Sequence, residues 1–276
     1  MKINYHIHTS FSGDNIKERR LEETPEKYAE AAAKLGFGEI CFTDHLVIGY
    51  PRNVAAYEHG MEPEKLKEYF QRIDLVAKKY PQIKIKTGIE LDWLPEKLDE
   101  IKKVLRQYPF DCVLGSVHSI NGVKIEHIEN SKTFWEKLSD EEIYEKHAEY
   151  YRAVQEMAKS KICDIIAHLD LVKRDGYLPK KSLMPLIEET LDIIAKNNLC
   201  IEVNTLGMMK AIKEIHPTLE ILKLCKKKGI PVTIGTDAHK VERLDFHFED
   251  GLNLIKEAGY TELAVFEKRK RSFVKI

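Results

Sequence analysis

The sequence predicts an α/β barrel built from seven strand–helix units in a single domain, residues 1–276. Strand-like apolar runs alternate with amphipathic helical segments along the whole chain, a pattern typical of parallel α/β folds. A length of 276 residues with 43% hydrophobic content suits one such barrel, since these commonly have about 250 residues. Nearly every strand-like run ends in a polar residue, and active sites form at the carboxyl ends of barrel strands.

Short apolar or alternating runs predict the strands. Residues 262–266 form a candidate eighth strand. The basic tail that follows contains Phe273, and we expect this tail to be a packed C-terminal strand. No linker, internal repeat or low-complexity tract divides the chain, so one domain is expected. The seven predicted strands lie at residues 1–9, 39–42, 83–89, 112–114, 164–167, 200–204 and 231–235.

Apolar residues recurring at helical spacing predict the helices between these strands. Thr24 followed by Pro25 is a typical helix start, and Ser139 with Glu142 has the pattern of a capping box. The stretch 119–138 is expected to be a long irregular loop, and loops of that length are usually functional. The predicted helices cover about residues 25–35, 63–80, 95–108, 139–159, 183–197, 218–228 and 248–258.

Composition excludes several classes of partner. The chain has 44 basic and 45 acidic residues and a formal net charge of −1, so no basic excess supports binding to nucleic acid or a membrane surface. No apolar run approaches the ~20 residues of a membrane span, and no signal-peptide core precedes His6, so a cytoplasmic location is expected. The five cysteines lack C-x-x-C spacing and are expected to be reduced core residues.

Histidines and carboxylates gather at the strand ends. His6 and His8 are two residues apart, so in an extended strand both imidazoles point to one side and can bind one metal ion. Because the strand ends of a barrel meet at one rim, the whole set is expected to converge there. The set is His6, His8, His45, Glu90, His118, His168, Asp237 and His239. Three of the five remaining histidines, His59, His127 and His147, are expected at the surface.

Six motifs occur in a fixed order, and together they resemble the polymerase and histidinol phosphatase (PHP) superfamily. They are His6-x-His8, Thr43-Asp44-His45, Gly88-Ile89-Glu90, Gly115-Ser116-Val117-His118, Ala167-His168 and Gly235-Thr236-Asp237-Ala238-His239. Within this superfamily, the chain is similar to the histidinol-phosphate phosphatase family, at residues 114–122, 168–174 and 266–270. The resemblance implies a distorted (β/α)7 TIM-like barrel with two or three divalent metal ions at the C-terminal ends of the strands. It also implies hydrolysis of L-histidinol phosphate to L-histidinol and phosphate in histidine biosynthesis.

The resemblance implies three groups of metal ligands. They are His6, His8, Glu90 and Asp237 for one ion; Glu90, His118 and His168 for a second; and Asp14, His45 and His239 for a third. Asp14 stands where relatives have histidine, and a plain turn residue is its alternative. Zinc, manganese and iron all suit such ligands, which do not select sharply among these metals.

Phosphate monoesters are anionic and hydrolyse very slowly without a catalyst. Two metal ions about 3.5–4 Å apart neutralise the phosphoryl oxygens, and a hydroxide bridging them is the expected nucleophile. In line with the family, Asp92 is the expected general acid, with a helix N-cap as its alternative. Arg174 or Lys173 is expected to bind phosphate, with a solvated loop charge as the alternative. Further candidates for substrate binding are Ser119, Glu202, Asn204 and His216, and a structural polar pair is the alternative for Glu202 and Asn204.

Three other functions fit parts of the pattern. A PHP phosphoesterase acting on nucleotides, nucleic-acid ends or other small phosphate monoesters is one alternative, although no polymerase segment accompanies the motifs. A non-catalytic, metal-stabilised module is another, but it should have lost ligands. An amidohydrolase-like enzyme is the third, but no bridging lysine stands at a strand end. The sequence indicates no oligomeric state.

Overall fold

Seven parallel strands form the wall of a nearly closed barrel in the computed structural model, which describes residues 1–49, 58–120, 123–125 and 134–276. Along the sheet the order is β1 (Lys2–Asn4), β2 (Phe37–Phe42), β4 (Lys84–Asp92), β5 (Cys112–Ser116), β8 (Ile165–Ile166), β9 (Cys200–Asn204) and β10 (Val232–Gly235). The short β3 (His45–Leu46) pairs with the end of β4. The first and last strands approach each other where the Tyr5 amide donates to the Ile234 carbonyl at 2.9 Å. The predicted barrel is confirmed.

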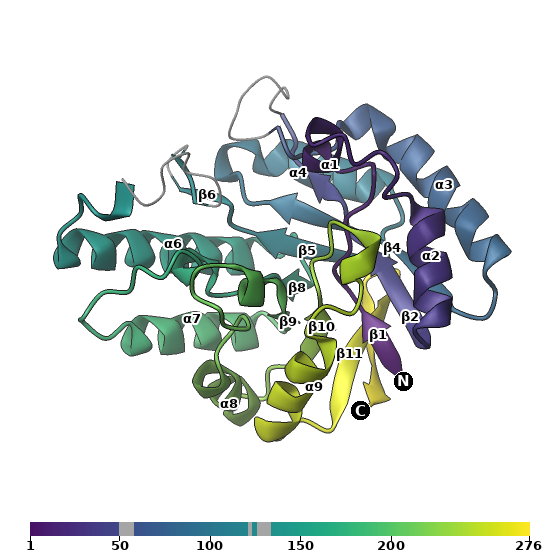
Figure 1. Cartoon of the computed structure of the whole chain (residues 1–276). Helices are drawn as coiled ribbons and strands as arrows, with labels where there is room; N and C mark the ends of the chain where they lie inside the picture. The colour runs from purple at the N-terminus through teal and green to yellow at the C-terminus, as the bar shows by residue number, and fades with distance from the viewer. Residues whose placement is uncertain (50–57, 121–122, 126–133) are drawn as a thin grey trace.

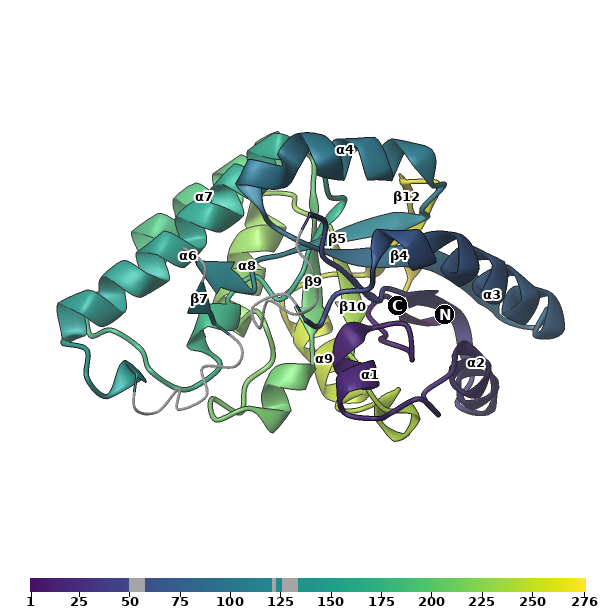
Figure 2. The ribbon, with the colours of Figure 1, turned by 90° about the horizontal axis from the view of Figure 1, so that it is seen from above.

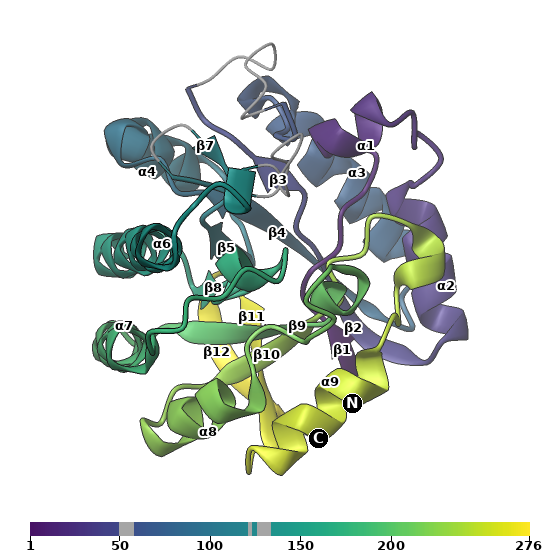
Figure 3. The same cartoon turned by 60° about the vertical axis from the view of Figure 1, so that its left-hand side comes forward.

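Helices surround this wall, and Figure 3 shows α6 and α7 end-on outside the strands. The longer helices bury one apolar face; in α3 the buried residues are Leu66, Tyr69, Ile73 and Val76. The helices are α1 (Gly13–Lys17), α2 (Pro25–Lys34), α3 (Leu66–Lys79), α4 (Leu98–Gln107), α6 (Asp140–Ser160), α7 (Met184–Lys196), α8 (Leu219–Lys227) and α9 (Phe248–Glu257). Short 3-10 turns occupy Pro63–Lys65, Pro95–Lys97, Leu171–Lys173, Leu206–Met209 and Val241–Arg243.

The predicted helix starts are confirmed at both sites. The Thr24 hydroxyl accepts a hydrogen bond from the Lys27 amide at the start of α2. At the start of α6, Ser139 and Glu142 form the reciprocal capping box. The predicted irregular stretch 119–138 contains a small antiparallel pair, β6 (Ser119–Ile120) with β7 (Val123–Lys124), which the sequence did not indicate. Residues 121–122 and 126–133 of that stretch lie outside the described part of the chain.

The candidate eighth strand does not join the barrel. It forms β11 (Glu262–Glu267), which pairs antiparallel with β12 (Lys270–Lys275) in a separate two-stranded sheet. The turn residues Lys268 and Arg269 have φ of 50° and 62°, the left-handed conformation that a tight hairpin turn requires. That turn sends the chain straight back, so β11 takes its partner from the tail. The expected packed C-terminal strand is therefore present, but the prediction that it forms an eighth strand of the barrel is wrong.

This hairpin packs at the end of the barrel where the strands begin. The Arg269 guanidinium binds Asp164, which directly precedes β8, with Nε 2.9 Å from Oδ2. The Lys268 amide donates to Asp111, which directly precedes β5. The two chain ends meet here, since the Met1 ammonium donates to the Lys275 carbonyl at 3.2 Å (Figure 1 and Figure 2). The opposite end of the barrel therefore carries the strand-end polar residues.

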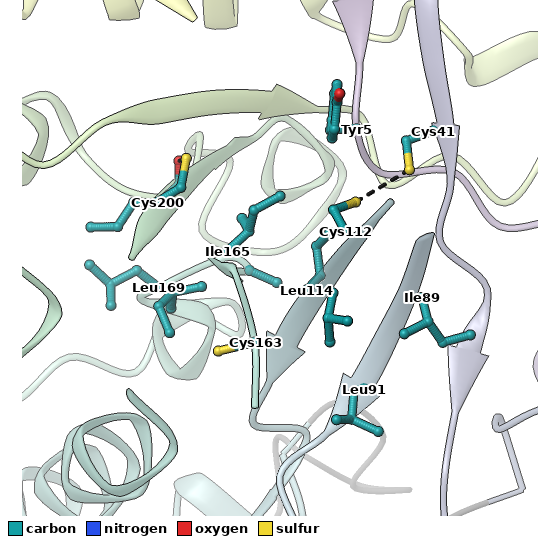
Figure 4. Close-up of a cluster of buried hydrophobic side chains, with 14 of the residues drawn as sticks. Tyr5, Cys41, Ile89, Leu91, Cys112, Leu114, Cys163, Ile165, Leu169 and Cys200 are labelled. Carbon is teal, nitrogen blue, oxygen red and sulfur yellow. Dashed lines mark hydrogen bonds between the residues drawn. The ribbon is translucent and has the colours of Figure 1, made fainter. Parts of the chain in front are cut away.

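All five cysteines are free and buried, as expected. Figure 4 shows the thiols of Cys41 and Cys112 facing each other, with their sulfur atoms 3.3 Å apart. Gly88 lies between them on the intervening strand, where an added Cβ would be only 2.8 Å from either sulfur. A glycine is needed there because the neighbouring side chains fill that space. No described helix is long and apolar enough to span a membrane.

Candidate active site

The strand-end histidines and carboxylates converge at the C-terminal rim of the barrel, as predicted. His6 and His8 follow β1, His45 begins β3, and Glu90 lies near the end of β4. His118, His168, Asp237 and His239 come from the loops after β5, β8 and β10, and Asp14 comes from α1. We call the converged set the metal cluster: His6, His8, Asp14, His45, Glu90, His118, His168, Asp237 and His239. Six of the nine are below 6% exposed, so most of the cluster is shielded from bulk water.

Glu90 is at the centre of this cluster and is fully buried. Its two carboxylate oxygens face two different groups of imidazoles. Oε2 lies 3.2 Å from His6 Nε2, 3.4 Å from His8 Nε2 and 2.7 Å from His45 Nδ1. Oε1 lies 3.3 Å from His118 Nε2 and 3.0 Å from His168 Nε2. One carboxylate thus separates two potential metal sites, which is the arrangement of a bridging ligand.

The remaining carboxylates extend the cluster on the side of His8. Asp237 Oδ1 lies 3.1 Å from His8 Nε2, and the residue has φ of 53°. Asp14 Oδ2 lies 2.9 Å from His239 Nε2. The rings of His8 and His239 are stacked with centroids 4.1 Å apart. Asp14 is therefore part of the cluster and contacts an imidazole, as a ligand would, and it lies in the first turn of the short helix α1.

Hydrogen bonds behind the imidazoles orient their inner nitrogens toward Glu90. His6 Nδ1 donates to Glu202 Oε1 at 2.6 Å. His8 Nδ1 donates to the Ser12 hydroxyl at 3.1 Å, because that hydroxyl gives its own proton to Asp44. These bonds fix the tautomer in which Nε2 carries a lone pair, the form that binds metals.

Several buried atoms of the cluster fit a bound cation. Among the described residues, His6 Nε2, His8 Nε2 and Glu90 Oε2 have no hydrogen-bond partner, although buried polar atoms are normally bonded. Their ligand atoms form one group within 4.8 Å of one another, and those of Glu90, His118 and His168 form another. Imidazole and carboxylate suit zinc, manganese or iron. The residues present therefore fit the divalent ions that the fold family implies.

The electrostatics agree with that fit. Burial alone would raise the pKa of Glu90, but the surrounding imidazoles of His45, His6 and His118 hold this pKa well below its usual range. Burial lowers the pKa of His6, yet Glu202, Asp237 and Glu90 outweigh it and raise this pKa well above normal. The cluster therefore attracts positive charge, either a proton on His6 or a metal ion in its place.

Asp92 lies directly behind His118. It is 2% exposed, accepts from His118 Nδ1 at 2.6 Å, and accepts from His59 Nε2 at 3.0 Å. Burial would raise its pKa, but the two imidazoles hold the pKa far below its usual range. The alternative of a helix N-cap is wrong, because Leu94 caps the turn that begins at Pro95. The general-acid role remains a prediction.

Two of the three histidines expected at the surface are buried. His59 is 3% exposed and contacts Asp92, whereas His147 is 1% exposed and bonds the Tyr177 carbonyl through Nε2 at 2.8 Å. The surface prediction is wrong for both, because their burial comes from segments distant in sequence. His127 lies outside the described residues. A polar stretch such as the one around His59 offers no periodicity that would reveal its burial.

The predicted phosphate-binding residues lie in the turn after β8, a few residues beyond His168 of the cluster. Arg174 is only 7% exposed, so it is not a solvated loop charge. Lys173 is 5% exposed and its ammonium is 2.9 Å from Asp170 and 2.8 Å from Glu214. His216 Nδ1 donates to the same Asp170 at 2.7 Å. Lys173 and His216 thus belong to one buried charge network.

Of the other candidates for substrate binding, Glu202 and Asn204 contact the metal cluster, and Ser119 directly follows His118 in the sequence. Glu202 holds His6 and accepts the His168 amide at 3.0 Å. The Asn204 amide group donates to Glu202 and to Asp237, both at 3.2 Å. Ser119 is half-buried at the start of β6. Glu202 and Asn204 therefore lie behind the metal cluster as a polar pair.

Comparison with known proteins identifies the class. The PHP domain matches residues 4–206, so the chain belongs to the PHP domain family. Within that family the chain is similar to histidinol phosphatases over nearly its full length. A probable histidinol-phosphatase of Deinococcus radiodurans is 31% identical, with 92% of each chain covered. The histidinol-phosphatase of Lactococcus lactis is 30% identical, covering 98% of this chain and 96% of the relative.

A solved structure supports the same relationship. The histidinol phosphate phosphatase of Lactococcus lactis, crystallised with zinc, L-histidinol and phosphate, superposes with a TM-score of 0.82. Its sequence is 29% identical and 98% of each chain is covered. The barrel fold is therefore shared with the solved structure of this histidinol phosphate phosphatase.

Proposed function

We propose that this chain is a metal-dependent phosphomonoesterase that hydrolyses L-histidinol phosphate to L-histidinol and phosphate. The observation that carries the proposal is Glu90, a buried carboxylate with one oxygen facing three imidazoles and the other facing two. The similarity over the full chain to phosphatases of this substrate supports the choice of substrate.

Two groups of residues would hold the metal ions, with Glu90 shared between them. They are His6, His8 and Asp237 on one side and His118 and His168 on the other, and a third ion would lie among Asp14, His45 and His239. When bound, divalent ions at such a separation neutralise the phosphoryl oxygens and activate water as the nucleophile. The residues of the chain thus need to supply ligands, orientation and a proton, and no side chain attacks the phosphorus.

Proton transfer to the leaving alkoxide falls to Asp92. Its carboxyl group lies between the rings of His118 and His59, so its position relative to the metal cluster is fixed. Because the two imidazoles hold this carboxylate ionised, it would first take up the proton that water gives off as it becomes the nucleophile, and then pass that proton to the leaving oxygen. Replacing Asp92 by Asn keeps the shape and removes the transferable proton, so turnover should fall about 10²–10⁴-fold.

Arg174 is the residue we assign to the phosphate, because a planar guanidinium binds two phosphoryl oxygens at once. Lys173 is held by Asp170 and Glu214, so it supports the Arg174 turn with His216. Glu202 and Asn204 act indirectly, because they position the metal ligands His6 and Asp237. Ser119, which follows His118, is the residue we assign to the histidinol portion of the substrate.

The test is phosphate release from L-histidinol phosphate, compared with nucleotide and sugar phosphates, by protein stripped of metal and then reloaded. We expect the highest kcat/KM for L-histidinol phosphate, and a collapse in His8→Ala and Arg174→Ala. His147→Ala is the control, because it removes a buried imidazole away from the cluster. Higher kcat/KM for nucleotides would replace the proposed substrate, and no release with any metal would refute the proposed reaction.

A further inference from the structure

The segment of residues 58–61 carries a histidine that the proposed reaction does not use. His59 is 3% exposed and lies behind the metal cluster, outside the ligand set assigned above. Its ring makes edge contacts with two cluster imidazoles, with centroids 4.7 Å from His45 and 5.3 Å from His118. A buried polar ring in this position needs a reason, because burial of an imidazole costs free energy unless its polar atoms are bonded.

Backbone contacts on both sides fix this segment. The Gly13 amide donates to the His59 carbonyl at 2.7 Å. Gly60 packs so tightly against Val47 that an added Cβ would lie 2.6 Å from the valine Cβ. The Met61 amide then donates to the His45 carbonyl at 2.7 Å. The His59 side chain is therefore delivered to the cluster from a rigid segment, next to a proposed metal ligand.

The imidazole completes a chain of hydrogen bonds. His59 Nε2 is 3.0 Å from Asp92 Oδ2, and Asp92 Oδ1 is 2.6 Å from His118 Nδ1. Each oxygen of the Asp92 carboxylate thus has its own imidazole, so the carboxylate cannot rotate without breaking one of the two bonds. On its far side, His118 directs Nε2 toward Glu90 at 3.3 Å.

We propose that His59 is a positioning residue that acts through Asp92 to hold His118 in the tautomer and orientation that bind metal. A carboxylate behind a ligating histidine fixes the ring and raises its basicity, and loss of such a partner typically weakens metal binding about 10–100-fold. His59 extends this arrangement by one residue, since it fixes the carboxylate itself. Its effect on turnover rests on the proposed function, but its effect on metal affinity does not.

The test compares variants of the full-length chain by the metal retained at buffered free zinc concentrations and by phosphate release. His59→Leu removes the bond to Asp92, whereas His59→Gln keeps a donor near the position of Nε2. We expect one site to bind zinc about tenfold more weakly in His59→Leu and nearly normally in His59→Gln. Gly60→Ala, which pushes the segment away from Val47, should weaken the same site.

His147→Leu is the matched control, because it removes another buried imidazole whose bond goes to the Tyr177 carbonyl. It should retain zinc like the wild type. Unchanged zinc affinity in His59→Leu, or equal losses in His59→Leu and His59→Gln, would overturn the proposal. Complete loss of one bound ion in both His59 variants would also overturn it and make His59 a direct ligand with His45, Asp92 and His118. If zinc affinity falls in His59→Leu but not in His59→Gln, while the wild type shows no phosphatase activity, the positioning role of His59 would be supported and the proposed reaction would be refuted.

Discussion

Removing the metal ions should destabilise the protein strongly, because the cluster leaves carboxylates and imidazoles buried without their cation. A site saturated at 100 times its dissociation constant adds about 2.7 kcal/mol to the free energy of unfolding. The two sites that share Glu90 would together add about 5 kcal/mol. For a chain of this size each kcal/mol shifts Tm by roughly 2–4 °C, so stripping should lower Tm by about 10–20 °C.

The assay is thermal unfolding of stripped and reloaded protein, with the metal content of each sample measured. Glu90→Gln keeps the side-chain shape but removes the shared negative charge, so it should lose most of the metal-dependent shift. Glu39→Gln is the control, because Glu39 is a buried carboxylate that binds the Tyr5 hydroxyl near the opposite end of the barrel. Equal Tm values for fully stripped and loaded protein, or a full metal-dependent shift in Glu90→Gln, would show that metal ions bound at Glu90 do not stabilise the fold.

Three further predictions concern other parts of the structure. Arg174→Lys replaces a planar fork by a point charge and should raise KM for L-histidinol phosphate about tenfold at unchanged metal content; an unchanged KM would contradict the assignment. Arg269→Ala removes the paired bonds to Asp164 and should lower the free energy of unfolding by about 2 kcal/mol, measured by urea denaturation, with turnover intact. Burial raises the pKa of the Cys163 thiol to about 12, and all five cysteines are buried. A thiol reagent at pH 8 should therefore modify none of them until denaturant is added, and rapid labelling of native protein would show that the core opens.

The arrangement of the barrel could be predicted because each element carries its own local signal. The buried face of α3 repeats at helical spacing, and the capping box of Ser139 and Glu142 marks the start of α6. The metal cluster could be predicted for a geometric reason, since polar residues at the ends of parallel strands meet at one rim. Glu90 and His6 are far apart in the sequence, yet the fold alone brings them together.

The remaining features depend on contacts that local sequence does not encode. The apolar pattern of β11 is the same whether the strand joins a barrel or a hairpin, and the turn residues Lys268 and Arg269 are not the glycine or asparagine typical of tight turns. His59 is buried because its carbonyl accepts the Gly13 amide and because the next residue, Gly60, packs tightly against Val47. Neither glycine forms part of a recognisable motif.

Anomalous diffraction from crystals of the metal-loaded protein would show whether Glu90 bridges two metal ions. We expect at least two anomalous peaks, one on each side of Glu90. One should lie among His6, His8 and Asp237, and the other beside His118 and His168. A single peak, or peaks that Glu90 does not contact, would show that Glu90 is not a bridging ligand.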